Sequence, residues 1–278
     1  MTPLHIAASL LSALLHAGWN AGVKASARPA DAMAAQMLMS AVLVAPVLLW
    51  TGLPPAQSWP WIAASTVMNT LTVTALLRAY QLGGFGLVYP VARAVSVLLV
   101  VPLAALLAGE HLALPALGGI GLVSVSLALL AWSAGRDHAF PRRALVWTLL
   151  AGLSTAAYVM CDARGVRTAG SPWAYGTAVS ITNALAMSWR QRGLATPGQL
   201  LRANWRMALP TALASVASYL LILWVWSEAP IAPASALRDT SAVFALLIAI
   251  IWLREPFTVA RIVCVLLAAA AVPLLRLA

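Results

Sequence analysis

The sequence predicts an all-α integral membrane protein, with ten transmembrane helices arranged as two inverted five-helix repeats around a central cavity. Three observations lead to this fold class. Hydrophobic residues make up 62% of the 278 residues and charged residues only 9%. Apolar stretches close to twenty residues long recur along the whole chain. The two halves of the chain also carry the same polar residues at matching places inside apolar segments.

The composition indicates a surface that faces lipid. A soluble domain carries about 25% charged residues, and a chain with 9% cannot build a water-facing surface. The net charge of +10 raises the alternative of a nucleic-acid partner. However, the seventeen cations are scattered singly or in pairs, mostly in the connectors, with no basic face or stacking motif. We therefore expect no nucleic-acid partner, and we expect these cations to orient the helices against anionic lipid.

Ten apolar segments have roughly the 20 residues that a helix needs to cross a bilayer core of about 30 Å. They cover residues 4–24, 32–51, 59–80, 86–108, 113–133, 143–163, 172–190, 205–227, 233–253 and 257–275. Turn-forming residues separate them: Arg28-Pro29, Pro54-Pro55, Gly83-Gly84, Gly135-Arg136-Asp137, Gly170-Ser171-Pro172, Pro230 and Glu255-Pro256. The connectors are short, so we expect one compact membrane domain with a first repeat over residues 1–137 and a second over 138–278.

Five is an odd number of spans, so the second repeat enters the membrane from the side opposite to the first. Inverted repeats allow one site to be presented alternately to each side. The connectors on one side hold eleven cations: Lys24, Arg28, Arg136, Arg142, Arg143, Arg190, Arg192, Arg202, Arg206, Arg254 and Arg261. The other side holds Arg164, Arg167 and Arg276. Basic connectors favour the cytoplasm, so this count places both termini outside.

The most informative repeat is a pair of arginines in the fourth and ninth spans. Arg93-Ala-Val-Ser96 aligns without a gap to Arg238-Asp-Thr-Ser241. A charged side chain at the centre of a membrane helix costs about 2.5–3.5 kcal/mol, so each arginine is expected to face the bundle interior or a wet cavity. We predict that at least one of them attracts a substrate carboxylate or holds a gate. The alternative is that each pins neighbouring helices through backbone carbonyls.

Helical spacing places further polar residues beside the two arginines. Tyr89, Arg93 and Ser96 share one face of the fourth span. In the ninth span, Asp239 points about 100° away from Arg238 and need not pair with it. Asp239 can instead pair with Arg93 of the other half, or take a substrate ammonium group or a proton.

Aromatic residues recur at matching depth in the first and sixth spans. The first contains His16-Ala-Gly-Trp19-Asn20, and the sixth places Tyr158 at the equivalent position of Trp19. These aromatic side chains either line a cavity, together with Asn20, or fill helix contacts. Tyr80, in the third span, either joins them or anchors its helix at the membrane surface. The third span is also unusually polar, with Ser65, Thr66, Asn69, Thr70, Thr72 and Thr74.

Prolines and glutamates mark the ends of the repeated unit. Pro90 and Pro233 lie early in the fourth and ninth spans, where a proline frees a backbone carbonyl and provides a hinge. Glu110 and Glu255 each precede a new helix by two or three residues. We expect each glutamate to cap the helix that follows it and to complement its dipole.

The chain lacks the residue patterns of an enzyme or a metalloprotein. It contains no GxSxG, HExxH or aspartate-rich motif, so we predict no catalytic residues. Cys161 and Cys264 are the only cysteines, and both lie in apolar helical segments as expected of buried thiols. No Cys or His pattern indicates a metal site, and we expect no cofactor.

The chain resembles the EamA-type branch of the drug/metabolite transporter superfamily over nearly its whole length. The segments that carry the resemblance are His16-Ala-Gly-Trp-Asn20 with Lys24, Val88-Tyr-Pro-Val-Ala-Arg93, Ala236-Leu-Arg-Asp-Thr-Ser241, Gly109-Glu110 and Arg254-Glu255-Pro256. In architecture the nearest members are bacterial aromatic amino-acid exporters of the YddG type. The usual second-half motif has glutamate after the arginine, whereas this chain has Asp239, which keeps the charge with a shorter reach.

The resemblance implies a secondary transporter that works by alternating access in the bacterial inner membrane. Its expected substrates are small metabolites, above all amino acids and aromatic ones among them, and its expected direction is export. It also implies cytoplasmic termini, which is opposite to the charge count. The sequence leaves open whether the chain forms a homodimer. Efflux of lipophilic cations is the alternative function, although Asp162 and Asp239 are the only acids available inside the spans to bind them.

Overall fold

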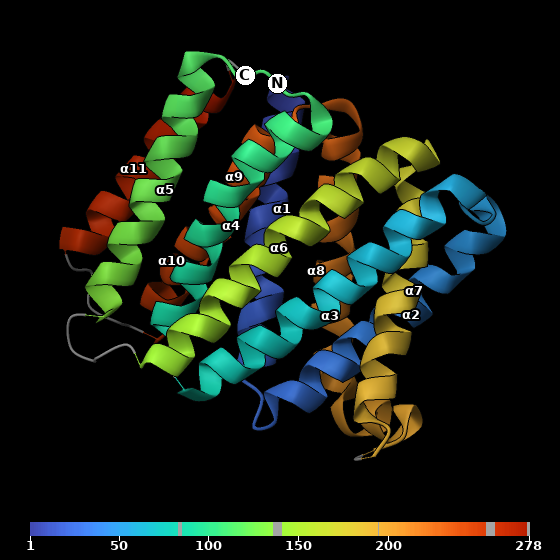
Figure 1. The fold of residues 1–278 in the computed structure, drawn as a ribbon. Helices are drawn as coiled ribbons and strands as arrows, with labels where there is room; N and C mark the ends of the chain where they lie inside the picture. Colours follow the sequence, from blue (N-terminus) through green and yellow to red (C-terminus); the bar gives the residue numbers. More distant parts are fainter. Residues whose placement is uncertain (83–84, 136–140, 194, 254–258, 277–278) are drawn as a thin grey trace.

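The computed structural model describes residues 1–82, 85–135, 141–193, 195–253 and 259–276. These residues are almost entirely helical and contain no strand (Figure 1). The helices are α1 (Pro3–Lys24), α2 (Pro29–Thr51), α3 (Trp59–Leu82), α4 (Phe85–Ala108), α5 (Leu114–Gly135), α6 (Arg142–Ala169), α7 (Pro172–Gln191), α8 (Pro197–Glu228), α9 (Ile231–Asp239), α10 (Ser241–Leu253) and α11 (Val259–Arg276), with a short 3₁₀ turn, η1 (Ala56–Ser58), before α3. The all-α class is therefore confirmed for these residues.

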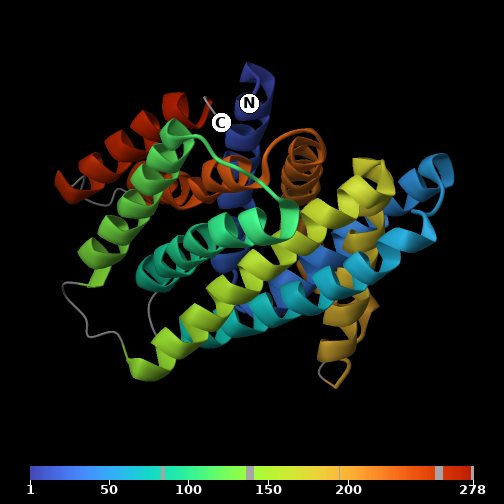
Figure 2. The ribbon, with the colours of Figure 1, turned by 45° about the horizontal axis from the view of Figure 1, so that its top comes forward.

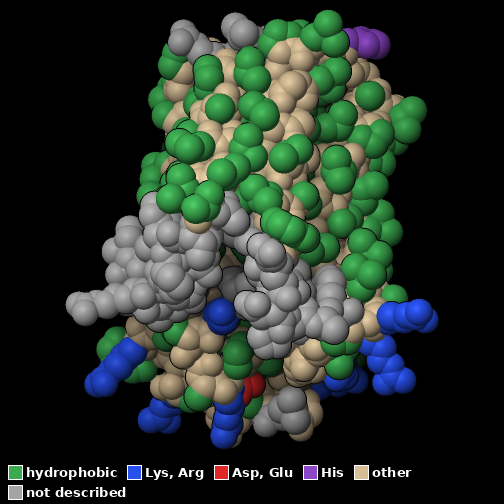
Figure 3. Space-filling model, turned by 90° about the vertical axis from the view of Figure 1, so that its left-hand side faces the viewer, with side chains coloured by type: hydrophobic (Ala, Val, Ile, Leu, Met, Phe, Trp, Pro, Cys, Tyr) green, Lys and Arg blue, Asp and Glu red, His purple; other side chains and the backbone are tan. Residues whose placement is uncertain are grey.

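Most of these helices have the length and composition of membrane spans. Within the described residues, seven helical segments are long and apolar enough to cross a bilayer, and α5 and α11 contain shorter apolar segments. Large apolar side chains are strongly exposed, for example Leu49 at 92% and Leu106 at 81%. Figure 3 shows hydrophobic side chains over most of one face, with Lys and Arg gathered at one end. Such a surface suits lipid, while the count of ten spans stays a prediction.

The helices form a bundle in which both termini lie at the same end (Figure 1). α5 and α11 pack side by side at one flank in both ribbon views (Figures 1 and 2). At the other flank α2 packs against α7 and α8. α1 and α6 run through the middle, where α1 contacts α8 and α6 contacts α3 and α4.

Paired hydroxyl groups join the helices that cross in the middle of the bundle. The Ser12 hydroxyl in α1 donates to the Ser218 carbonyl in α8 at 2.7 Å, and Ser218 returns a bond of 2.7 Å to the Ser12 carbonyl. The Thr72 hydroxyl in α3 donates to Ser154 in α6 at 2.8 Å. Interhelical bonds of this kind contribute about 0.6 kcal/mol each on average in membrane bundles. Both crossings join one half of the chain to the other, and both are held by similar hydrogen bonds.

A glycine allows α4 and α6 to approach closely. A Cβ atom at Gly152 would lie 2.6 Å from Val95 Cβ and 2.9 Å from the Ala92 carbonyl oxygen. Small residues at such crossings let helix backbones pack at short range, which provides the van der Waals contact that drives association in lipid. This contact fixes the part of α4 that carries Arg93.

The predicted ninth span is not one continuous helix, because α9 ends at Asp239 and α10 begins at Ser241. At the break the Thr240 hydroxyl donates to the Leu237 carbonyl at 2.6 Å, and the Thr240 amide donates to the same oxygen at 3.3 Å. A side chain that competes for backbone carbonyls in this way disturbs the regular helical pattern. The break places Arg238 and Asp239 at the end of a half-helix inside the bundle.

The interruption of the predicted ninth span therefore lies at Thr240, and the hinge role of Pro90 and Pro233 stays a prediction. Pro233 lies in the first turn of α9, where a missing amide donor is tolerated. Pro90 lies within α4, which continues as a helix through it. Neither proline ends a helix.

Glu110 caps a helix, but not the one that follows it in the sequence. Gly109, at φ 67°, ends α4, and the Glu110 amide bonds back to the Ala104 carbonyl at 3.2 Å. The Glu110 carboxylate then accepts hydrogen bonds from the amides of Ile231 and Ala232 at 2.6 and 3.2 Å. It therefore caps α9, in the other half of the chain, instead of α5. Glu255, the other predicted cap, lies outside the described residues.

Arg167, in α6, stabilises the junction at which α8 ends and α9 begins. Its Nε donates to the Trp226 carbonyl at 2.9 Å and its NH2 group donates to the Ala229 carbonyl at 2.8 Å. These are the carbonyls that would have bonded to the amides of residues 230 and 233 in a continuous helix, and both of those residues are prolines. The Arg167 guanidinium thus replaces two missing donors, and it lies 3.8 Å from the Glu110 carboxylate.

Replacing Glu110 with alanine is expected to lower the free energy of unfolding by about 1–3 kcal/mol, because the first amides of α9 lose their acceptors and Arg167 loses its counter-charge. Thermal unfolding in detergent measures the loss. Glu228→Ala is the matched control, with a smaller loss expected, since the half-exposed Glu228 carboxylate contacts the side chains of His5 and Trp224 but caps no helix in the described chain. Equal stability of the two variants would contradict this role.

Candidate functional site

A polar cavity lies inside the bundle, between helices of both halves. Its volume is about 140 Å³, several times the roughly 10–15 Å³ that one water molecule requires. The charged and ring-bearing side chains on its wall are His16, Trp19, Tyr80, Arg93, Tyr158, Asp162, Tyr219 and Arg238. Amides and hydroxyls complete the polar lining: Asn20, Gln36, Ser40, Ser65, Asn69, Thr72, Thr155, Ser180, Asn183 and Ser215.

A basic vestibule of about 670 Å³ adjoins the cavity and shares Asn20 and Tyr80 with its wall. It lies where α1 ends and α2 begins, which is the end of the bundle opposite to the termini (Figure 1). Its charged side chains are Lys24, Arg28, Asp31, Arg78 and Arg190. Four cations against one carboxylate give the vestibule a positive potential, which favours the approach of molecules that carry a carboxylate.

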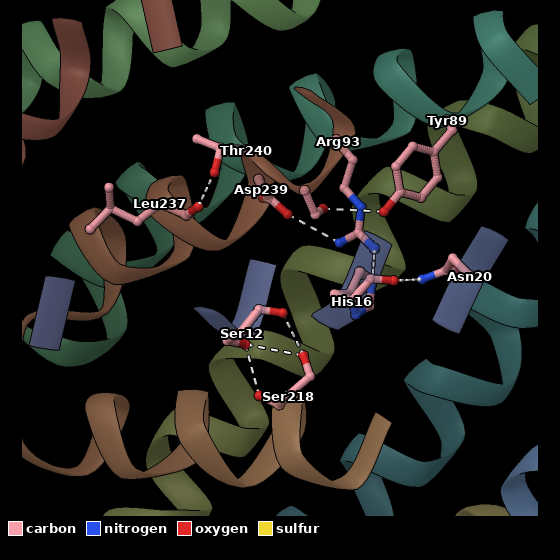
Figure 4. A network of polar contacts seen from close by, with 10 residues as sticks. Ser12, His16, Asn20, Tyr89, Arg93, Ser218, Leu237, Asp239 and Thr240 are labelled. Carbon is pink, nitrogen blue, oxygen red and sulfur yellow. Dashed lines mark hydrogen bonds and ion pairs between the residues drawn. The ribbon is translucent and has the colours of Figure 1, made fainter. Parts of the chain in front are cut away.

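Arg93 is the centre of a polar network that joins three helices (Figure 4). Its NH1 group donates to Asp239 Oδ1 at 3.0 Å, and its NH2 group donates to His16 Nε2. Its guanidinium carbon lies 5.0 Å from the centroid of the Tyr89 ring. The Tyr89 hydroxyl lies 3.2 Å from that of Ser241 at the start of α10. Arg93 is therefore paired and buried, with 7% of its surface exposed.

Arg238 lies in the last turn of α9 and, unlike Arg93, it has no ion-pair partner in the described residues. Within these residues it forms no hydrogen bond either and its buried Nε has no acceptor, although its charge acts on the carboxylates of Asp162 and Asp239. The guanidinium carbon lies 5.5 Å from the centroid of the buried Trp226 ring, and the side chain lines the cavity. A cation in the last turn complements the helix dipole, but the hydrogen-bonding capacity of the guanidinium stays unused.

Asp162 in α6 provides a carboxylate on the same wall. It is 1% exposed and accepts hydrogen bonds from the phenol groups of Tyr175, at 3.1 Å, and Tyr219, at 2.8 Å. No ion pair in the described chain includes Asp162. Two neutral phenols thus hold a buried acid at the edge of the cavity.

The structure brings six of the ten predicted cavity residues to the wall: Trp19, Asn20, Tyr80, Arg93, Tyr158 and Arg238. The other four, Tyr89, Ser96, Asp239 and Ser241, are buried behind Arg93 and do not line the cavity. Asp239 and Tyr89 contact Arg93 directly. They therefore position a wall residue instead of forming the wall.

Several wall residues were not among the predicted set, above all Asp162, His16 and Tyr219. Asp162 follows Tyr158 by four positions, so the two share a helix face, and this spacing was the available signal. In α3, Ser65, Asn69 and Thr72 line the cavity at helical spacing. Thr66, Thr70 and Thr74 do not line the cavity, and each donates to a carbonyl of its own helix.

The second half of the chain has recognisable relatives. Residues 142–277 match the EamA-like transporter family. The apolar helices indicate a multi-pass membrane protein, and the family that its second half matches is one of membrane transporters. Members of this family are transporters and not enzymes, in agreement with the absence of catalytic motifs in the sequence.

The likeness to solved structures extends over nearly the whole chain. In all, 27 chains of solved structures match significantly. One crystal structure superposes with a TM-score of 0.76 over 98% of this chain and 94% of its own, at 14% sequence identity. At that identity the likeness concerns the fold alone. No curated protein matches the sequence significantly.

Proposed function

We propose that this protein is a secondary transporter that exports small metabolites, in particular amino acids and aromatic ones among them, across the bacterial inner membrane. The observation that carries the proposal is Arg238, a buried cation without a partner on the wall of a polar cavity. Burying a charge is costly unless it is paired. A substrate carboxylate would supply the missing partner, and the basic vestibule favours its entry.

The proposed mechanism is alternating access by two inverted repeats, residues 1–137 and 138–278. The packing supports this division, because the contact of α1 with α8 has a counterpart in the contact of α6 with α3. In the same way α1 contacts α9 and α10 where α6 contacts α4. Swapping the first and second halves thus maps these contacts onto one another. Rocking of one unit against the other would open the cavity first to one side and then to the other.

In this mechanism the network around Arg93 acts as the gate between the halves. It joins α4, through Arg93, to Asp239 of α9 and to His16 of α1. These contacts exist in the conformation seen here, with the cavity adjoining the basic vestibule. We propose that binding of a substrate carboxylate to Arg238, at the break between α9 and α10, favours the conformation in which the cavity opens to the other side of the membrane.

The substrate is tested with purified protein in liposomes and a panel of labelled amino acids. Counterflow of one or more amino acids, well above that of protein-free liposomes, is the expected result. Aromatic amino acids are expected within the accepted set, because Trp19, Tyr80 and Tyr158 line the cavity. If purified, folded protein moves none of the panel, the proposed substrate class is wrong.

One observation favours a second candidate, the efflux of lipophilic cations. Asp162 lies on a wall that also contains Tyr158 and Tyr219, and an acid among aromatic rings suits such ligands. Arg238 on the same wall opposes them by charge repulsion. Transport of a permanently charged aromatic cation, without transport of amino acids, would favour this candidate over the first.

A further inference from the structure

The carboxylate of Asp162 has binding capacity that the protein itself does not use. An ionised carboxylate offers about four lone-pair sites. The described hydrogen bonds to this side chain come from the phenols of Tyr175 and Tyr219, and the Ser65 hydroxyl and the charge of Arg238 also act on it. Taking a carboxylate out of water is expensive, and hydrogen bonds from neutral groups offset less of that cost than a cation would. Asp162 is therefore an acceptor on a cavity wall, held in place by two rings.

Arg238 lies on the wall of the same cavity as Asp162, and its Nε has no hydrogen-bond acceptor. The two do not form an ion pair with each other. The remaining charged residue of the wall, Arg93, is neutralised by Asp239 at 3.0 Å. The cavity wall therefore carries one positive and one negative charge that attract each other without forming an ion pair in the described residues.

We propose that Asp162 is the site for the ammonium group of the substrate, while Arg238 binds its carboxylate. This inference rests on the proposed transport function and narrows its substrate class to molecules that carry both charges. A zwitterion satisfies both wall residues at once. A simple amine leaves Arg238 unpaired, and a simple carboxylic acid leaves Asp162 unpaired, so each is bound less well.

The two tyrosines act as positioning residues for this site. The Tyr219 hydroxyl donates to Asp162 Oδ2 and the Tyr175 hydroxyl donates to Oδ1, so each carboxylate oxygen has one protein donor. Tyr175 is fully buried and Tyr219 lines the cavity. With both oxygens fixed, the carboxylate is pre-organised to receive an ammonium group without the entropic cost of ordering a free side chain.

The test compares Asp162→Asn with wild-type protein in liposomes, using the amino acid that wild type moves fastest and its analogues. For phenylalanine these analogues are phenethylamine, which lacks the carboxylate, and 3-phenylpropionate, which lacks the ammonium group. Asparagine keeps an oxygen and an amide for the two tyrosines but removes the charge. The apparent affinity for phenylalanine is expected to fall about ten- to a hundredfold, since bonds to charged groups contribute this much. The affinity for 3-phenylpropionate is expected to stay the same or to rise.

Arg238→Gln is the converse experiment. The apparent affinity for phenethylamine relative to phenylalanine is expected to rise, and the apparent affinity for 3-phenylpropionate is expected to fall. Opposite shifts in selectivity cannot result from partial unfolding, which lowers all rates together. Glu228→Gln is the matched control, because it removes one negative charge from a half-exposed site outside the cavity. Its selectivity should equal that of wild type.

The outcomes separate this inference from the function on which it rests. Wild-type protein that transports amino acids, combined with an Asp162→Asn variant of unchanged selectivity, overturns the ammonium site and leaves the transport function standing. Wild-type protein that moves no amino acid overturns both. Loss of phenylalanine with retention of 3-phenylpropionate in Asp162→Asn supports both.

Discussion

Replacing Arg93 with methionine is expected to lower the free energy of unfolding by about 3–5 kcal/mol, because the substitution leaves the Asp239 carboxylate buried without its cation. Asp239 is 4% exposed, and Arg93 is its ion-pair partner in the described chain, at 3.0 Å. The His16 ring also loses the donor to its Nε2 atom. Transport is expected to disappear with the gate. Thermal unfolding in detergent and counterflow in liposomes measure the two effects.

The double substitution Arg93→Met with Asp239→Leu separates the charge from the packing. With both charges removed, no uncompensated carboxylate is left, and replacing a buried ion pair by apolar side chains is often neutral or stabilising. Most of the lost stability should therefore return, while transport stays absent because the gate is still missing. A double variant as unstable as the single one would show that Arg93 contributes through packing or other contacts instead of through its pairing with Asp239.

The sequence predicts much of this arrangement because intramembrane charges are rare and costly. Arg93 and Arg238 are recognisable from one sequence, since an apolar solvent leaves a buried arginine few alternatives to a partner or a cavity. Pairing of Asp239 with Arg93 was one of the alternatives that the sequence raised, and the structure contains this ion pair. The cavity-facing side of α3 follows helical spacing in the same way.

Other features depend on contacts between distant segments, and local patterns do not encode them. Glu110 stands just before α5 in the sequence, yet its carboxylate caps α9 across 121 positions of the chain. The break at Thr240 results from one hydroxyl that bonds to Leu237, and threonine is common in unbroken membrane helices. A local motif also does not predict that Arg93 has an ion-pair partner while Arg238 has none in the described residues. Asp239 is adjacent to Arg238 in sequence but contacts Arg93 in space.

This difference between the arginines leads to an opposite expectation for Arg238. Replacing Arg238 with methionine is expected to abolish the transport of amino acids while keeping or raising stability by about 1 kcal/mol or more, because it removes a buried charge that has no ion-pair partner in the described residues. The substitution also removes the contact with Trp226, which at 5.5 Å contributes about 0.5–2 kcal/mol. The larger desolvation cost of the unpaired guanidinium decides the sign.

Arg192→Met is the matched control for the loss of an arginine from an aromatic face. The Arg192 guanidinium carbon lies 3.6 Å from the centroid of the Trp189 ring at the exposed end of α7, away from the cavity wall. This substitution should change stability by less than about 1 kcal/mol and leave transport intact. If Arg238→Met were instead destabilised as strongly as Arg93→Met, Arg238 would have to be a structural residue, and the unpaired guanidinium could no longer be the group that waits for a substrate carboxylate.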